Sequence, residues 1–287
     1  MVNDLFVTDR GQGPSVLALH GQPGLAGDWD GVVSRLVDDH RLLVPDRPGY
    51  GRTGGGAVSM STNVEMLADL LIEKGATPAT VVGHSYGGGI AALLAAHRPE
   101  VVSGLVLVGS VGRADSLNVV DHILALPWAG ETLAAAGVVT FGKVMPRFRR
   151  MVVHFPGQSL AWLEASLPDR GYGDEATGSA RQIRRSFVVE QRTLMDEIAD
   201  VESALPEVAV PTMVLSGSWD VVVPPSVATS IASVIAGAEL VTVARTGHFV
   251  PRDAPQAVAD AVRRVEARAA SVSSDRPAPG QAEETSP

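Results

Sequence analysis

The stretch Val82-Gly-His-Ser-Tyr-Gly-Gly88 decides the fold, because an apolar strand turns directly into a helix at this point. The apolar run at 80–84 predicts a strand, and the small residues at 86–97 predict a helix that can pack closely against a sheet. The stretch matches the pattern G-x-S-x-G, which needs this context. A turn this sharp puts Ser85 at strained backbone angles, so its neighbours must be small. The two glycines of the pattern meet that need.

Other short apolar runs in the sequence also predict strands. Helical patterns separate them along the chain, including one that begins at Pro255 and runs to about Ala270. Continuous apolar strands that alternate with helices indicate a mostly parallel sheet covered on both faces, which is an α/β fold. The further strands are expected at 15–20, 41–46, 104–109, 212–216 and 239–243.

One long segment, 113–206, interrupts the alternation. It contains no convincing strand, but helical patterns occur at 116–126, 160–167 and 179–199. Because this segment is too long for a loop in a compact domain, we predict a helical cap inserted into a core formed by 1–112 and 207–270. The Ser-, Pro- and Glu-rich end of the chain, 271–287, is expected to be a disordered tail.

Composition excludes several classes of protein. The chain has 287 residues, no cysteine and a formal net charge of −9, so thiol chemistry is impossible and binding of nucleic acid is not expected. The N-terminus does not resemble a secretory signal, and no apolar run is long enough for a membrane span. We expect a cytoplasmic protein that acts on a small molecule. Its oligomeric state is not predictable from these features.

A serine hydroxyl is a poor nucleophile until a nearby base takes its proton. His248 follows the last expected strand, and Asp220 follows the strand before it, 28 positions earlier in the chain. A carboxylate at this place would fix the tautomer of the histidine and stabilise its protonated form. The order Ser85, Asp220, His248 therefore predicts a catalytic triad. Asp115, which follows the strand 104–109, is an alternative for the carboxylate.

The negative charge that develops on a carbonyl oxygen under attack needs two N–H donors. The backbone N–H of Tyr86 is one candidate, and that of Gln22, in the loop His20-Gly-Gln-Pro-Gly24, is the other. A cis peptide at Gln22-Pro23 would aim the second donor inward. His20 is expected to brace this loop and His84 to pack beside the site. The remaining histidines show no ligand spacing, so neither a metal nor a cofactor is expected.

These motifs together resemble the α/β-hydrolase superfamily, in its cap-bearing branch of esterases, lactonases, haloperoxidases, carbon–carbon bond hydrolases and epoxide hydrolases. The resemblance covers about residues 5–112 and 207–267, and it does not extend to the cap. It implies the α/β-hydrolase fold and hydrolysis by a serine triad. The segments that carry it are 20–24, Asp46-Arg-Pro-Gly-Tyr-Gly-Arg-Thr53, 83–87, 217–220 and 247–248.

One departure from the family narrows the reaction. Epoxide hydrolases and dehalogenases, which share the His-Gly-x-Pro loop, place an aspartate where this chain has Ser85. A serine that attacked an epoxide or a haloalkane would form an ether, which the triad cannot hydrolyse. We therefore expect cleavage of a small to medium, largely apolar ester or lactone through an acyl-serine. Cleavage of a carbon–carbon bond beside a ketone, or ligand binding with little turnover, stays an alternative.

Specificity is expected to come from the cap. Aromatic side chains often line such pockets, and we select Trp128, Phe141 and Trp162 as candidates, with Phe148 and Phe155 as further possibilities. The Gly171-Tyr-Gly173 region is expected to act as a hinge or flap that admits the substrate.

Overall fold

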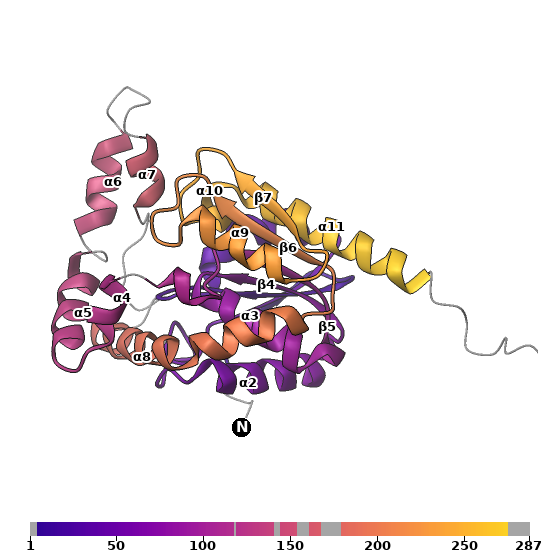
Figure 1. The fold of residues 1–287 in the computed structure, drawn as a ribbon, viewed down its shortest axis with the longest axis horizontal. Coiled ribbons are helices and arrows are strands. Elements are labelled where there is room, and N and C mark those ends of the chain that lie inside the picture. The colour runs from indigo at the N-terminus through magenta and orange to yellow at the C-terminus, as the bar shows by residue number, and fades with distance from the viewer. Residues whose placement is uncertain (1–4, 118, 141–143, 154–160, 168–178, 275–287) are drawn as a thin grey trace, which may run out of the picture.

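The computed structural model describes residues 5–117, 119–140, 144–153, 161–167 and 179–274, and it contains a seven-stranded sheet (Figure 1). The order of strands across the sheet is β1-β3-β2-β4-β5-β6-β7. Only β1 is antiparallel to its neighbour. The predicted mostly parallel sheet is thus confirmed. The strands are β1 Val7–Arg10, β2 Ser15–Leu19, β3 Arg41–Pro45, β4 Ala79–His84, β5 Val102–Val108, β6 Thr212–Gly217 and β7 Glu239–Val243.

Alternate residues of the central strands supply two apolar layers, because successive side chains of a strand point to opposite faces. Leu105 and Leu107 belong to a cluster with residues of α2, α3 and α9, whereas Val106 and Val108 belong to a cluster with residues of α1 and α11. The helices of the core are α1 Asp30–Leu36, α2 Met60–Glu73, α3 Tyr86–His97, α9 Pro225–Val234, α10 Val250–Asp253 and α11 Pro255–Ser274, with short 3-10 turns η2 Ala26–Trp29 and η3 Pro99–Val101.

All regular secondary structure described between β5 and β6 is helical. Figure 1 shows α4–α7 gathered beyond one end of the sheet, with α8 running back from them towards α3. Two of these helices, α5 and α6, lie outside the three helical patterns that were clearest in the sequence. The elements are η4 Ala114–Ser116, α4 Val119–Ala125, α5 Ala129–Val139, α6 Met145–Val153, α7 Ala161–Ser166, α8 Ala180–Ala204 and η7 Leu205–Glu207.

The long helix α8 belongs to two environments. Its residues Leu194, Ile198 and Val201 are buried in the same apolar cluster as α2 and α3, while α8 also contacts α4 and α5. The second half of α8 therefore packs as part of the core, although it lies within the segment 113–206 that was predicted to be the cap.

The predicted tail needs one correction at its start. Helix α11 continues to Ser274, so 271–274 are helical and not part of a tail that begins at Ser271. The helix therefore runs four residues beyond the end expected at about Ala270. The rest of the predicted tail lies outside the described residues.

The sheet order places a topological switch point at the carboxyl ends of β2 and β4. These strands are neighbours, but the chain leaves β2 towards β3 on one side and leaves β4 towards β5 on the other. Ligands of open α/β sheets bind at such a switch point. The loop that follows β2 and the turn that follows β4 meet here.

Candidate active site

Ser85 occupies a strained turn between β4 and α3. Its φ is 54° and its ψ is −121°, a conformation that costs free energy for a residue with a side chain. The Ser85 N–H donates to the carbonyl oxygen of Val108 at 3.0 Å, and the Ser85 carbonyl accepts from the N–H of Gly88 at 2.9 Å. These bonds on both sides of the residue hold the strained conformation in place.

Glycine is required on both sides of Ser85 because the chain crosses itself closely. A Cβ on Gly83 would lie 2.4 Å from the carbonyl oxygen of Gly87, and a Cβ on Gly87 would lie 2.5 Å from that of His20. Both carbonyl oxygens belong to the backbone, so neither clash can be relieved by turning a side chain. The expectation that these two positions must lack bulk is confirmed.

The loops after β6 and β7 bring a histidine and a carboxylate to Ser85. His248 Nε2 lies 3.0 Å from Ser85 Oγ, and His248 Nδ1 lies 2.8 Å from Asp220 Oδ2. All three residues are buried. The structure thus brings together the three residues selected from the sequence, in a continuous chain of hydrogen bonds.

The carboxylate of Asp220 is fixed from its far side. Its Oδ1 accepts from the backbone N–H groups of Val222 and Val223, each at 2.9 Å. Asp115, the alternative carboxylate, lies in a 3-10 turn with its side chain 53% exposed and 3.9 Å from Arg113. The carboxylate bonded to His248 Nδ1 is that of Asp220, so the geometry favours Asp220.

His84 holds the backbone of His248 and is not placed as a base. Its Nε2 lies 2.9 Å from the carbonyl oxygen of His248, which can only accept, so Nε2 carries the proton. Burial, together with the neighbouring His248, lowers the pKa of His84 to about 3. His84 is therefore neutral near pH 7, in agreement with its predicted packing role.

The loop after β2 approaches Ser85 closely. A Cβ on Gly21 would lie 3.0 Å from Ser85 Cβ, so the next residue, Gln22, begins beside the nucleophile candidate. The cis peptide at Gln22-Pro23 is confirmed. Tyr86 is the first residue of α3, and its N–H therefore belongs to the helix N-terminus, where negative charge is favoured.

His20 is fully buried and braces this loop, as predicted. The backbone N–H of Arg47 donates to His20 Nε2 at 2.9 Å, and His20 Nδ1 lies 2.9 Å from the carbonyl oxygen of Gly21. Because Nε2 accepts, Nδ1 must carry the proton and donate. Burial, reinforced by the nearby Arg47 charge, holds the pKa of His20 well below its usual value.

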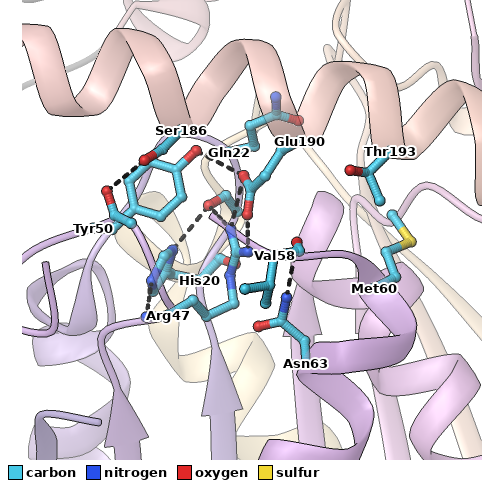
Figure 2. Close-up of polar contacts among 12 residues, drawn as sticks. His20, Gln22, Arg47, Tyr50, Val58, Met60, Asn63, Ser186, Glu190 and Thr193 are labelled. Carbon is cyan, nitrogen blue, oxygen red and sulfur yellow. Dashed lines mark hydrogen bonds and ion pairs between the residues drawn. The ribbon is translucent and has the colours of Figure 1, made fainter. Parts of the chain in front are cut away.

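A buried ionic cluster behind the loop escaped the sequence analysis. Arg47 forms an ion pair with Glu190 of α8, and neither side chain is exposed to solvent (Figure 2). The hydroxyl of Tyr50 donates to Glu190 Oε2 at 2.7 Å. One signal was available in the sequence: Glu190 interrupts an apolar stripe on α8 that includes Ile183, Leu194 and Ile198, and a lone carboxylate in such a stripe needs a buried partner.

The cap aromatics require a correction. Trp128 is 83% exposed, so its indole does not line an enclosed pocket. It lies directly before α5, at the N-cap position of that helix. Trp162 is 49% exposed and Phe148 is 37% exposed. The candidates Phe141 and Phe155 and the expected hinge at 171–173 lie outside the described residues.

Two classes of feature are absent from the described part of the chain. No group of three or more His, Asp or Glu residues there is arranged to hold a metal ion. Across the same residues, no helix combines the length and the apolar character that crossing a membrane would require.

Comparison with known proteins places the fold in a family. Residues 16–261 match the model of the alpha/beta hydrolase family. The chain is 29% identical over 257 residues to a pimeloyl-[acyl-carrier protein] methyl ester esterase of Nitrosomonas europaea, with 85% of this chain and 92% of the relative covered. It is 28% identical over 279 residues to an uncharacterized protein of Mycobacterium tuberculosis, with 88% and 75% covered.

Solved structures agree on the fold. A putative ancestral haloalkane dehalogenase superposes with a TM-score of 0.69 at 22% identity, with 92% of this chain and 96% of that chain covered. The chain therefore belongs to the alpha/beta hydrolase family. Because solved structures with a similar fold include a putative dehalogenase as well as an esterase, the reaction must be argued from the site and not from the fold.

Proposed function

We propose that this chain is a serine hydrolase that cleaves a small to medium, largely apolar ester or lactone through an acyl-serine intermediate. The observation that carries the proposal is the hydrogen-bonded chain Ser85–His248–Asp220, with its two contacts of 3.0 Å and 2.8 Å. The ester-cleaving relative of Nitrosomonas europaea supports the choice of reaction.

In the first half-reaction, Ser85 Oγ attacks the substrate carbonyl carbon while His248 Nε2 accepts the hydroxyl proton. The carbonyl electron pair becomes an oxyanion, which the backbone N–H groups of Gln22 and Tyr86 stabilise. The oxyanion then collapses, and His248 gives its proton to the departing alcohol oxygen. The acyl group is left on Ser85.

In the second half-reaction, water replaces the alcohol. His248 takes a proton from this water, whose oxygen attacks the acyl carbon, and the same two N–H groups stabilise the second oxyanion. Collapse releases the carboxylic acid and returns the proton to Ser85. Throughout, Asp220 holds His248 in the tautomer that leaves Nε2 free to accept, because its carboxylate binds Nδ1–H.

A fluorophosphonate probe tests the nucleophile without knowledge of the substrate. We expect the wild-type protein to be labelled at Ser85 and Ser85→Ala to remain unlabelled, with a loss of kcat on the order of 10⁶ on any ester that the wild type cleaves. Labelling that persists in the folded variant would show that another residue is the nucleophile. Absence of labelling in the wild type would favour a ligand-binding protein.

A substrate panel separates the reactions open to the same triad. p-Nitrophenyl esters, lactones and vinylogous diketones report ester, lactone and carbon–carbon bond cleavage respectively. We expect turnover of the first two classes, and turnover confined to the diketones would transfer the assignment to carbon–carbon bond hydrolysis.

A further inference from the structure

The ion pair between Arg47 and Glu190 joins two distant parts of the chain. Arg47 follows β3 and Glu190 lies on α8, 143 positions later in the sequence. Both side chains are fully buried. A buried ion pair is a weak source of stability, because the cost of removing two charges from water offsets their attraction. Stability alone therefore does not explain why this pair occupies the interior.

The remaining donors of Arg47 are directed at the loop after β2. Its Nη2 donates to the carbonyl oxygen of Gly21 at 2.8 Å, and its Nε donates to that of His20 at 3.1 Å. His20 Nδ1, 2.9 Å away, donates to the same Gly21 oxygen. One backbone carbonyl thus receives two buried donors, one of them charged.

The Gly21 carbonyl and the Gln22 N–H belong to the same peptide group. The bond between these residues is trans, since the only cis peptides in the described chain precede Pro23 and Pro78. In a planar trans peptide the C=O and the N–H point in opposite directions. Fixing the Gly21 oxygen on Arg47 and His20 therefore also fixes the direction in which the Gln22 N–H points.

We propose that Arg47 is a positioning residue for the oxyanion hole, and that Glu190 makes this positioning depend on helix α8. The inference rests on the proposed function, in which the Gln22 N–H stabilises the oxyanion. Arg47 acts by holding the peptide and by polarising it, because a charged donor on the carbonyl strengthens the N–H of the same group as a donor. Figure 2 shows Arg47 between His20 and Glu190, beneath α8.

The coupling to α8 is reinforced by a second contact on the same loop. The side chain of Gln22 donates from Nε2 to the backbone carbonyl of Phe187 at 2.8 Å, one turn before Glu190 on α8. Helix α8 therefore holds the oxyanion peptide from both ends: through Glu190 and Arg47 at its carbonyl side, and directly through Gln22. A shift of α8 would turn the donor away from the substrate oxygen.

The test compares Arg47→Met, Arg47→Lys and Glu190→Gln with a matched control, Ser186→Ala. Ser186 lies one turn before Glu190 on the same buried face of α8 and donates to the carbonyl of Gly49 at 2.8 Å. The control thus removes a buried bond between the same helix and the segment after β3, but leaves the Gly21–Gln22 peptide untouched.

The readouts are kcat and KM on a p-nitrophenyl ester, the inhibition constant of an aryl trifluoromethyl ketone, and the rate constant of fluorophosphonate labelling. The ketone carbon bonds to Ser85 Oγ, the Ser85 proton passes to His248, and the ketone oxygen becomes an oxyanion in the hole. Its affinity therefore reports the oxyanion contacts, whereas the KM of the ester mainly reports ground-state binding.

We expect Arg47→Met to lower kcat by about 10- to 100-fold, less than the 10²–10³ for deleting a donor outright, because the N–H is misdirected and not removed. KM should change little, and the ketone should bind more weakly by the same factor as kcat falls. Arg47→Lys should recover part of the loss, since it retains the charge. Glu190→Gln should act in the same direction, and Ser186→Ala should keep the wild-type kcat.

Thermal unfolding of every variant separates positioning from folding. If Arg47→Met does not fold, Arg47→Lys and Glu190→Gln decide. Folded variants at Arg47 and Glu190 that keep the wild-type kcat, ketone affinity and labelling rate would overturn the inference, as would a loss of the same size in Ser186→Ala. Failure of the wild type to be labelled would instead overturn the proposed function.

Discussion

His84 Nε2 donates to the backbone carbonyl of His248 across a distance of 2.9 Å, so the residue before Ser85 in the chain holds the backbone of the residue that faces Ser85. The turn after β4 and the loop after β7 are thus joined twice, by this bond and by the 3.0 Å contact between Ser85 Oγ and His248 Nε2. The distance between Ser85 and His248 depends on both.

We expect His84→Ala to lower kcat by about tenfold, because the loop that carries His248 loses an anchor and the alignment of reacting groups is steeply sensitive to displacement. His84→Gln, whose amide can donate to the same carbonyl, should keep most of the activity. Steady-state kinetics on a p-nitrophenyl ester measures both. Equal losses in the two variants would contradict an anchoring role.

The burial of His84 beside His248 also predicts its protonation state. Its pKa, lowered to about 3 mainly by burial, leaves it neutral above about pH 4, so it contributes no ionisation to kcat/KM between pH 5 and 9. We expect the pH profiles of the wild type and His84→Gln to have the same shape in this range. An ionisation that disappears in the variant would show that His84 titrates during catalysis.

The close packing of Gly21 predicts a steric effect of substitution on the loop after β2. A Cβ at this position would lie 3.0 Å from Ser85 Cβ and 3.1 Å from His84 Nδ1, closer than side chains normally approach. Gly21→Ala should displace the loop by a few tenths of an ångström and lower kcat by about tenfold or more, while the fold is retained. Kinetics with thermal unfolding checks this, and wild-type kcat in the variant would show that the loop has room to adjust.

The candidate triad could be predicted from sequence because each member sits at a strand end next to a local signal. Ser85 lies within a glycine pattern, and Asp220 and His248 follow apolar strands in a recognisable order. The geometry of the candidate triad is thus encoded by short segments, and the sheet aligns their ends.

The ion pair between Arg47 and Glu190 could not be predicted from local sequence signals. No spacing links a loop residue to a helix residue 143 positions away, and their contact depends on how α8 packs against the core. The assignment of Trp128 to an enclosed pocket failed for a similar reason. An aromatic residue of the inserted segment can line a pocket or lie on an outer face, and only the packing decides; Trp128 is 83% exposed.

His40 is a buried histidine directly before β3, where it contacts helix α11. Its Nδ1 lies 2.8 Å from Asp39 and its Nε2 lies 2.8 Å from Glu266. Arg263 binds Asp39, and Thr80 binds Glu266. Burial opposes the charged form of His40, but Glu266 and then Asp39 outweigh it and raise the pKa.

A raised pKa in the folded state means that protonated His40 stabilises the fold. This contribution is complete below the unfolded pKa of about 6.5, and it is lost as the pH rises through the higher folded pKa. We expect the melting temperature of the wild type to exceed that of His40→Gln most at about pH 5.5, and the difference to narrow above pH 7. A difference that grows with pH would contradict the assignment.

Asp220 and Asp115 provide the sharpest comparison, because they are the two carboxylates that the sequence offered as partners for His248. Asp220 Oδ2 lies 2.8 Å from His248 Nδ1, whereas Asp115 is half-exposed beside Arg113. Asp220→Asn should lower kcat by up to about 10⁴, because an amide in this place favours the wrong imidazole tautomer. The amide oxygen can still accept from the backbone N–H groups of Val222 and Val223, so the fold should persist.

The control is Asp115→Asn, which should leave kcat within about twofold of the wild type. The two variants are compared by kcat on one p-nitrophenyl ester and by thermal unfolding. A large loss in Asp115→Asn with little loss in Asp220→Asn would reverse the assignment, because only the carboxylate bound to His248 can set its tautomer.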